Sequence, residues 1–281
     1  MSHGAKGDRW RRLAASVVVF ILLTSCRAGA AFEVVWPDAR SAAMLGRSTL
    51  VSRLLEPAGG RPFADGRDRT TWRVTVSGGE LYGLREAAGG AFAAEARWGG
   101  ACVGGSGTTL GGDLYSERSL ALGAGWSPGS LLSFALVVRA AGISASGTDD
   151  VWSTAVDVGV SRSFAGRVVL SACGENVGRA GIGGSPMTSR TRLRAALELD
   201  VAELSCSVDT EGGFDPTLTL GAEARPCGWL SVRAGAGYSP ARFGAGLGFA
   251  SPDGRWPEVD LACQWHPRLG VSAYASVGFR L

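Results

Sequence analysis

Apolar and polar residues alternate with a period of two along most of the chain from residue 71 to the C-terminus. A period of two places neighbouring side chains on opposite faces of an extended strand, so the pattern predicts β-strands with one apolar and one polar face. Near the C-terminus the apolar set is Val271, Ala273, Ala275, Val277, Phe279 and Leu281, and the other set is Ser272, Tyr274, Ser276, Gly278 and Arg280.

The alternation divides into about fourteen segments, separated by short stretches with turn chemistry such as Ser127-Pro128-Gly129 and Pro252-Asp253-Gly254. Most segments are 8 to 14 residues long, whereas strands of globular proteins average about 5–6 residues and strands that cross a bilayer need about 9–11. Short turns between long strands predict an antiparallel up-and-down meander. The predicted strands are 71–78, 88–98, 100–107, 114–126, 131–144, 151–163, 166–175, 189–200, 203–211, 217–225, 228–238, 241–250, 256–265 and 270–281.

Alternation alone leaves two fold classes open. In a soluble β-sandwich the apolar face packs into a core, whereas in a membrane barrel the apolar face meets lipid and the polar face lines the lumen. The chain has 43 glycines and only 19% charged residues, and its polar faces are rich in small residues that suit a crowded lumen. Together with the strand length, these features favour an all-β transmembrane barrel. A soluble or lipid-tethered periplasmic β-sandwich that binds a partner is the alternative.

The N-terminus has the features of an export signal. Lys6, Arg9 and Arg11 precede an apolar run over residues 13–24, which is too short to span a bilayer as a helix. We therefore expect a signal peptide over residues 1–30 and location in the cell outer membrane. Ala28-Gly29-Ala30 fits a signal-peptidase site, but residues 23–26 resemble a lipobox, which would leave Cys26 lipidated.

Residues 31–70 differ from both neighbouring regions, and we expect them to form an N-terminal plug or leader before the barrel at residues 71–281. Within this segment, residues 41–55 have a helical apolar face made by Met44, Leu45, Val51, Leu54 and Leu55. A short helix that packs in or against the barrel mouth would explain the pattern.

The composition excludes several chemistries. Lys6 is the only lysine and His266 is the only histidine after His3, so a P-loop, a lysine Schiff base and a histidine-rich metal site are not available to the mature chain. The net charge is +3; residues 1–30 hold five basic residues and one acidic residue, which leaves −1 for the rest. We therefore expect no cofactor, no metal, no nucleic-acid partner and no catalysis.

Two stretches resemble FadL-like, PorV-type outer-membrane barrels. Residues 111–147 are similar to the middle of those barrels, where a Tyr-x-Glu (here Tyr115 and Glu117) opens a strand. Residues 235–281 are similar to their ending, with Val259-Asp260-Leu261-Ala262 and then His266-Pro267-Arg268-Leu269-Gly270 in the corresponding places. The resemblance covers about two thirds of the chain. It implies solute passage or a secretion-associated or structural role, with outer-membrane lipid, the barrel-insertion machinery, and either a hydrophobic solute or secretion-system components as partners.

Several charged residues occupy the polar faces of the later strands. If the barrel is right, they line the lumen and form ion pairs across it, which would make the lumen narrow or plugged. By the same parity, Cys206 and Cys263 face lipid as free thiols. The predicted lumen-lining residues are Arg192, Arg194, Glu198, Asp200, Glu203, Glu223, Arg225, Arg233, Glu258, Asp260 and Arg280.

Overall fold

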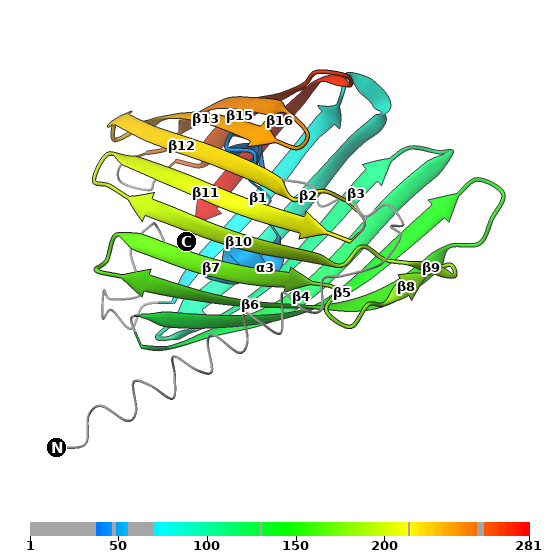
Figure 1. Cartoon of the computed structure of the whole chain (residues 1–281), viewed down its shortest axis with the longest axis horizontal. Coiled ribbons are helices and arrows are strands. Elements are labelled where there is room, and N and C mark those ends of the chain that lie inside the picture. Colours follow the sequence, from blue (N-terminus) through cyan, green and yellow to red (C-terminus); the bar gives the residue numbers. More distant parts are fainter. Residues whose placement is uncertain (1–37, 47–48, 56–69, 130, 213, 252–255) are drawn as a thin grey trace.

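The computed structural model describes residues 38–46, 49–55, 70–129, 131–212, 214–251 and 256–281. Fourteen strands form one closed antiparallel barrel (Figure 1). The barrel strands are β1 (Thr71–Leu81), β2 (Leu84–Trp98), β3 (Ala101–Gly111), β4 (Tyr115–Gly129), β5 (Leu132–Ala145), β6 (Val151–Phe164), β7 (Val168–Glu175), β10 (Arg190–Glu198), β11 (Ala202–Glu211), β12 (Thr217–Cys227), β13 (Leu230–Tyr238), β14 (Arg242–Phe249), β15 (Glu258–His266) and β16 (Gly270–Arg280).

The barrel closes because its last strand pairs with its first. Arg280 of β16 lies opposite Arg73 of β1, and the backbone N–H groups of Trp72 and Leu281 each donate to the other residue's carbonyl over 2.9 Å. Every other neighbour in the ring is also paired antiparallel, so the sheet closes on itself, as a spanning sheet in lipid requires. All fourteen predicted strands are confirmed, and their ends move by only a few residues.

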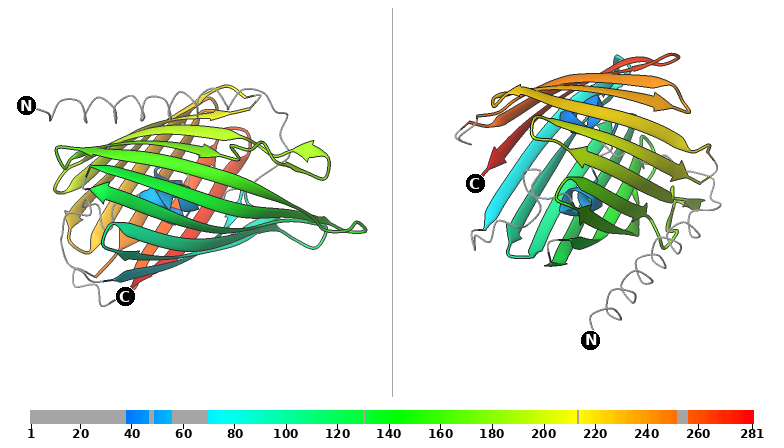
Figure 2. Two further views of the ribbon diagram at one scale, coloured as in Figure 1. Left: turned by 90° about the horizontal axis from the view of Figure 1, so that it is seen from below. Right: turned by 60° about the vertical axis from the view of Figure 1, so that its left-hand side comes forward.

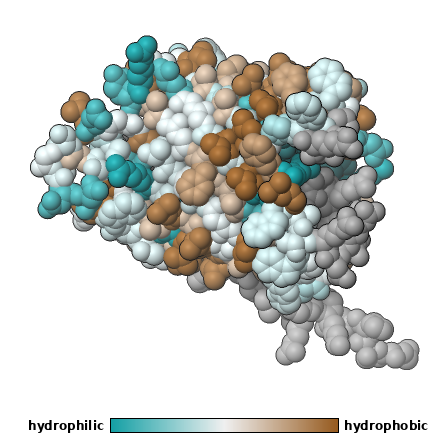
Figure 3. Space-filling view, turned by 180° about the vertical axis from the view of Figure 1, so that it is seen from behind, coloured by the Kyte–Doolittle hydropathy of each residue, from teal (hydrophilic) through white to brown (hydrophobic). Residues whose placement is uncertain are grey.

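The two faces of the sheet are sorted as a membrane barrel requires. Large apolar side chains point outward and are exposed, with Leu122 at 74% and Leu120 at 55%, and Figure 3 shows such side chains gathered over the middle of one face. Charged side chains such as Arg233 and Asp157 are buried inside at 3% each. This sorting contradicts the β-sandwich alternative, because a soluble protein does not leave its apolar strand faces in water.

Aromatic residues mark both ends of the outer surface. Trp72, Trp98 and Trp126 are exposed near the barrel end where β1 begins and β16 finishes, and Trp152 and Trp265 are exposed near the opposite end. Amphipathic aromatic rings belong at the two membrane interfaces. Among the described residues, no helix is long and apolar enough to cross a membrane.

The N-terminal segment lies inside the barrel as two short helices, α2 (Ala39–Ala43) and α3 (Leu50–Leu55), drawn in blue within the ring of strands (Figures 1 and 2). The short helical plug segment expected here is confirmed, and its residues form two helices where the sequence pattern suggested one. Leu45 has a φ of 54°, and this left-handed conformation ends α2 because it cannot continue a right-handed helix. Thr49 precedes α3 and caps it, because its Oγ1 accepts from the Ser52 N–H at 3.3 Å.

One feature of the structure was not predicted, and one prediction falls on residues that the structure does not describe. A small two-stranded sheet, β8 (Gly181–Ile182) with β9 (Ser185–Pro186), interrupts the meander between β7 and β10 and was not predicted. The predicted signal peptide, including Cys26, lies outside the described residues.

Candidate functional site: the plugged lumen

The helix α3 packs apolar side chains against the inner wall of the barrel. Val51, Leu54 and Leu55 are 0–3% exposed, and they form a buried cluster with wall residues such as Val137 and Cys102. The Cys102 thiol also lies 3.5 Å from the carbonyl oxygen of Leu54. The apolar face predicted from the sequence is thus satisfied inside the barrel, against strands β3 to β7.

Glycines in the inner wall make room for this helix. A Cβ added at Gly159 would lie 2.6 Å from Leu55 Cδ1, and one added at Gly123 would lie 2.9 Å from Leu54 Cδ1. Both distances are shorter than real Cβ contacts, so a larger residue at either strand position would require the leucine side chains of α3 to shift. The small residues of the polar faces are therefore part of the seat of α3.

The helix α2 sits on a second glycine seat on the opposite side. A Cβ at Gly244 would lie 2.5 Å from the Ala43 carbonyl oxygen, and a Cβ at Gly246 would lie 2.6 Å from Ala43 Cβ. Gln264 donates from Nε2 to the Ala42 carbonyl oxygen at 2.8 Å, so one of the terminal carbonyls of the helix has a partner in the wall. The helix contacts strands β13 to β16, and Ala39, Ala42 and Ala43 are buried against them.

Arg40 connects α2 to a charged cluster on the wall. Its Nη2 lies 3.0 Å from Glu203 Oε2, and its Nε lies 2.9 Å from Glu223 Oε2. The wall supplies further cations to the same carboxylates: Arg194 lies 2.6 Å from Glu203, and Arg233 lies 2.7 Å from Glu223. We name Arg40, Arg194, Glu203, Glu223, Arg225, Arg233 and Asp260 the Arg40 cluster, since Arg225 also pairs with Glu223 and Arg233 with Asp260.

The cluster is deeply buried at its centre. The side chains of Glu223 and Arg233 are both 2% exposed. Removing one partner of such a pair leaves a buried charge without compensation, which costs about 3–5 kcal/mol. Glu223 therefore needs its cations, and Arg40 of the plug is one of them.

Arg53 makes the corresponding connection from α3. It lies 3.4 Å from Asp38 and 3.9 Å from Glu95, and it donates to Thr75 Oγ1 at 2.9 Å. Arg97 of β2 donates to the backbone carbonyl of Arg53 at 2.6 Å. Each short helix thus carries one arginine that binds wall residues, and Asp38 joins the two helices because it also accepts from the Ser41 N–H at 2.7 Å.

The remaining predicted lumen residues are spread over other places. Arg192 pairs with Asp209 at 2.6 Å, and Glu258 pairs with Arg280 at 3.4 Å near the chain terminus. Glu198 is the half-buried last residue of β10, and Asp200 is exposed in the turn that follows. Six of the eleven predicted residues lie together in the Arg40 cluster.

The sequence reasoning did not select several interior charges on the earlier strands. Glu95 and Arg97 are two apart on β2 and pair at 2.8 Å, and Arg139 pairs with Asp157 at 3.0 Å between β5 and β6. Their positions follow the same period of two, so parity could have identified them. For Arg40 and Arg53 no period was available, because the plug is irregular.

His266 and the cysteines are the remaining residues whose side chains could carry chemistry. His266 lies at a turn, where its Nδ1 accepts from the backbone N–H groups of Arg268 and Leu269 at 3.2 Å. Over the described part of the chain, no group of three His, Cys, Asp or Glu side chains is arranged to hold a metal ion. The five described cysteines are free, and Cys263 is exposed on the outer face, as parity predicts.

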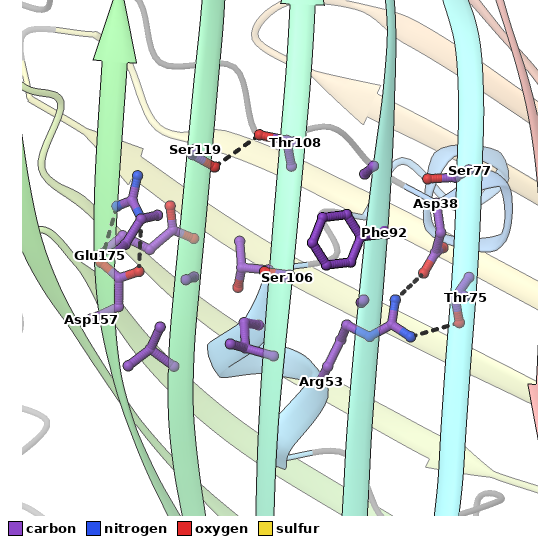
Figure 4. A pocket seen from close by; sticks show the side chains of 17 residues that line it. Asp38, Arg53, Thr75, Ser77, Phe92, Ser106, Thr108, Ser119, Asp157 and Glu175 are labelled. Carbon is purple, nitrogen blue, oxygen red and sulfur yellow. Dashed lines mark hydrogen bonds and ion pairs between the residues drawn. The ribbon is translucent and has the colours of Figure 1, made fainter. Parts of the chain in front are cut away.

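A cavity remains between the plug and strands β1 to β7, with a free volume of about 50 Å³ (Figure 4). Arg53 and Asp38 stand on one side of it, and Asp157 and Glu175 stand on the other. Ser106 lies between the two sides. We name this space the lumen chamber, and its further lining residues are Thr49, Leu50, Thr75, Ser77, Ala91, Phe92, Ala93, Thr108, Ser119, Ala121, Val137 and Arg139.

Comparison with solved structures places this fold beside known channels. The toluene transporter TbuX of Ralstonia pickettii is similar with a TM-score of 0.56 and 12% identity, over 89% of this chain and 99% of that one. The toluene transporter TodX of P. putida gives 0.57 and 10%, over 88% and 97%. A TodX deletion mutant described as a monoaromatic hydrocarbon channel gives 0.57 and 11%, over 89% and 98%.

The sequence comparisons add no closer relative. No protein-family model matches the chain, and no curated protein matches it. The structural similarity therefore concerns the fold, and at this level the resemblance seen in the sequence is confirmed. The chain is a closed fourteen-strand barrel of the outer-membrane type, with two short helices inside.

Proposed function

We propose that this protein is a non-enzymatic outer-membrane channel for a small solute, held closed by the plug that the helices α2 and α3 form. The observation that carries the proposal is the seating of both helices on glycines and around two arginines, Arg40 and Arg53. A barrel closed only by its own wall side chains would be filled permanently. A lumen filled by a separate segment becomes open when that segment moves.

The charged interior has a defined part in this proposal. The predicted residues that belong to the Arg40 cluster, together with Arg192 beside Asp209, act as a mixed-charge lumen lining that holds the plug, whereas Asp200 in its exposed turn is not part of this lining. Residues 31–70 then form the plug segment and residues 71–281 the channel wall. Residues 1–30 act as the export signal, Cys26 is removed or lipidated with its cleavage, and the insertion machinery assembles the barrel in outer-membrane lipid.

Two candidate functions follow from the similarities of this chain to other barrels. The similar structures are described as toluene transporters and a monoaromatic hydrocarbon channel, which puts hydrophobic solutes among the candidates. A secretion-associated role, in which the barrel binds another protein, is the second candidate function, and it rests only on the sequence resemblance. The apolar outer surface is compatible with both candidates. A lumen that is closed by a plug, which can move away from the wall, favours solute passage.

A reversible tether between plug and wall tests the proposal. A Cβ added at Gly221 would lie 3.0 Å from Met44 Cβ and 2.9 Å from Ser205 Oγ. Since disulfides need about 3.5–4.5 Å between the two Cβ atoms, Met44→Cys with Gly221→Cys requires the plug to move slightly away from the wall and the Ser205 hydroxyl to rotate. The purified variant is placed in liposomes, and uptake of small solutes is measured with the disulfide oxidised and then reduced. Uptake that stops on oxidation and returns on reduction supports gated passage; equal uptake in both states overturns it.

Membrane location is tested separately. Outer membranes from a Gram-negative host that expresses the full chain are analysed in SDS with and without boiling. A closed barrel gives a mobility shift and needs detergent for extraction, whereas a carbonate-soluble chain without a shift contradicts outer-membrane location.

A further inference from the structure

The lumen chamber is lined by hydroxyl groups on several strands. Ser77, Ser106 and Thr108 belong to β1 and β3, Ser119 belongs to β4, and Thr75 adds another hydroxyl on β1. Thr108 and Ser119 bond each other at 2.8 Å, and Thr75 accepts from Arg53. Among the residues that the structure describes, Ser77 and Ser106 have no recorded hydrogen-bond partner, so their hydroxyls are available to a bound molecule.

The charges at the ends of the chamber compensate each other. Arg53 faces Asp38, and Arg139 binds Asp157 through two nitrogens at 3.0 and 3.1 Å. The fifth charge, Glu175, has Arg190 at 3.5 Å. An anion or a cation entering the chamber would meet groups that already have partners, and it would leave its own hydration without a matching opposite charge.

The chamber is also unsuited to a hydrocarbon. A purely apolar molecule would displace water from the hydroxyls without replacing its hydrogen bonds, and each polar group left unsatisfied costs about 1–3 kcal/mol. The apolar part of the lining consists of Leu50, Ala91, Phe92, Ala93, Ala121 and Val137, which alternate with the hydroxyl-bearing residues. Such a lining suits a molecule that carries both hydroxyls and C–H surface.

The volume of the lumen chamber narrows the class of ligand further. The free volume of about 50 Å³ corresponds to about three to five water molecules, which is close to the size of glycerol. We propose that the lumen chamber binds a small neutral polyol of about this size, with Ser77 and Ser106 as its hydrogen-bonding residues. The proposal deepens the proposed function, because it names the solute class for the same lumen, and it departs from the hydrocarbons named for the similar structures.

The test uses the intact barrel in detergent and saturation-transfer NMR with glycerol as the probe. Lactate serves as an anion of the same size, and toluene serves as the hydrocarbon. The variant Ser77→Ala with Ser106→Ala removes both hydroxyls and keeps the small side-chain size. Ser276→Ala is the matched control, because Ser276 lies directly opposite Ser77 in the β1–β16 pair, is buried at 3%, and does not line the chamber.

We expect a saturable glycerol signal that falls at least threefold in the double variant and persists in Ser276→Ala, with lactate and toluene giving less than a third of it. A double variant with the wild-type signal, or displacement of glycerol by toluene or lactate, overturns the proposal. The tether experiment distinguishes failure of the proposed channel from failure of the proposed polyol site. Glycerol that binds the chamber but never enters liposomes contradicts the channel, whereas tether-dependent uptake that ignores both serines contradicts only the polyol site.

Discussion

Arg40 of α2 donates from Nε to Glu223 of β12 over 2.9 Å, although the two residues are 183 positions apart in the chain. Glu223 is one of the most buried carboxylates of the wall, and it also binds Arg233 and Arg225. The plug is therefore held by a charge that the wall would have to compensate by itself if the plug moved away.

Replacing Arg40 by Ala is expected to loosen the plug by about 1–2 kcal/mol, which corresponds to a 5- to 30-fold rise in the displaced state. The wall arginines still compensate Glu223, so the barrel itself stays folded. The natural thiols Cys102 and Cys173, which α3 covers, report the change through their rate of reaction with a maleimide.

The control for that experiment is Arg280→Ala, because Arg280 is 58% exposed in its side chain and pairs only loosely with Glu258. It should leave the thiol rates at wild-type values. Arg40→Ala with unchanged rates would show that the ion pairs do not hold the plug.

Adding one methyl group to the seat of α2 is expected to displace that helix. In Gly244→Ala the new Cβ would lie 2.5 Å from the Ala43 carbonyl oxygen, and such overpacking costs about 1–3 kcal/mol. Gly78→Ala is the control, because its Cβ would meet the nearest atom at 3.5 Å. The midpoint temperature of thermal unfolding in detergent should be lower in Gly244→Ala than in the wild-type protein and unchanged in Gly78→Ala. Equal midpoints in the two variants would contradict a close fit of α2 on these glycines.

A charge on the outer face is expected to destabilise the barrel in lipid. Leu220 is 53% exposed on the outside of β12, opposite Cys206, and an arginine on the lipid face costs about 2–4 kcal/mol at the bilayer midplane and less toward the interfaces. Leu220→Arg should therefore lower the urea midpoint of folding into lipid vesicles. Leu114→Arg, in the turn between β3 and β4, should have little effect, and an equal loss in both variants would contradict the assigned lipid face.

The segment between β7 and β10 depends on one buried side chain. Asn176 is 0% exposed, donates to the carbonyls of Ala180 and Met187, and accepts from the Ala180 N–H at 2.8 Å. Asn176→Ala leaves these groups unsatisfied at about 1–3 kcal/mol, so limited proteolysis should cut residues 177–189 faster. Thr148→Ala, which removes an exposed hydroxyl bond in another loop, should not change the cleavage pattern.

The barrel itself could be predicted because a period of two continues through every strand, and because residues such as Trp126 and Trp152 mark where strands approach the interfaces. The orientation followed from glycine on the polar faces, and the structure gives the physical reason: Gly123, Gly159 and Gly244 are the seat of the plug. The strand ends and turns needed no information from distant parts of the chain.

The plug could be predicted only in part. The apolar residues of α2 and α3 were visible, but the left-handed turn at Leu45 is local and is held by packing that no periodicity reveals. Which wall carboxylates meet Arg40 and Arg53 depends on the barrel register and on the path of the plug, so Glu95 could not be paired with Arg53 from the sequence. The charge alternation on β10 to β15 nevertheless identified six residues of the Arg40 cluster.

Planar-bilayer conductance of the variant Arg40→Ala with Arg53→Ala, compared with the wild-type chain, tests the central claim most directly. Both substitutions remove the ionic contacts of the plug and leave the wall strands intact. If the plug closes a channel, the double variant opens in discrete steps far more often than the wild-type protein, and the two proteins have the same heat-modifiable mobility. A double variant that folds and inserts, yet conducts no more than the wild-type protein, would contradict the account.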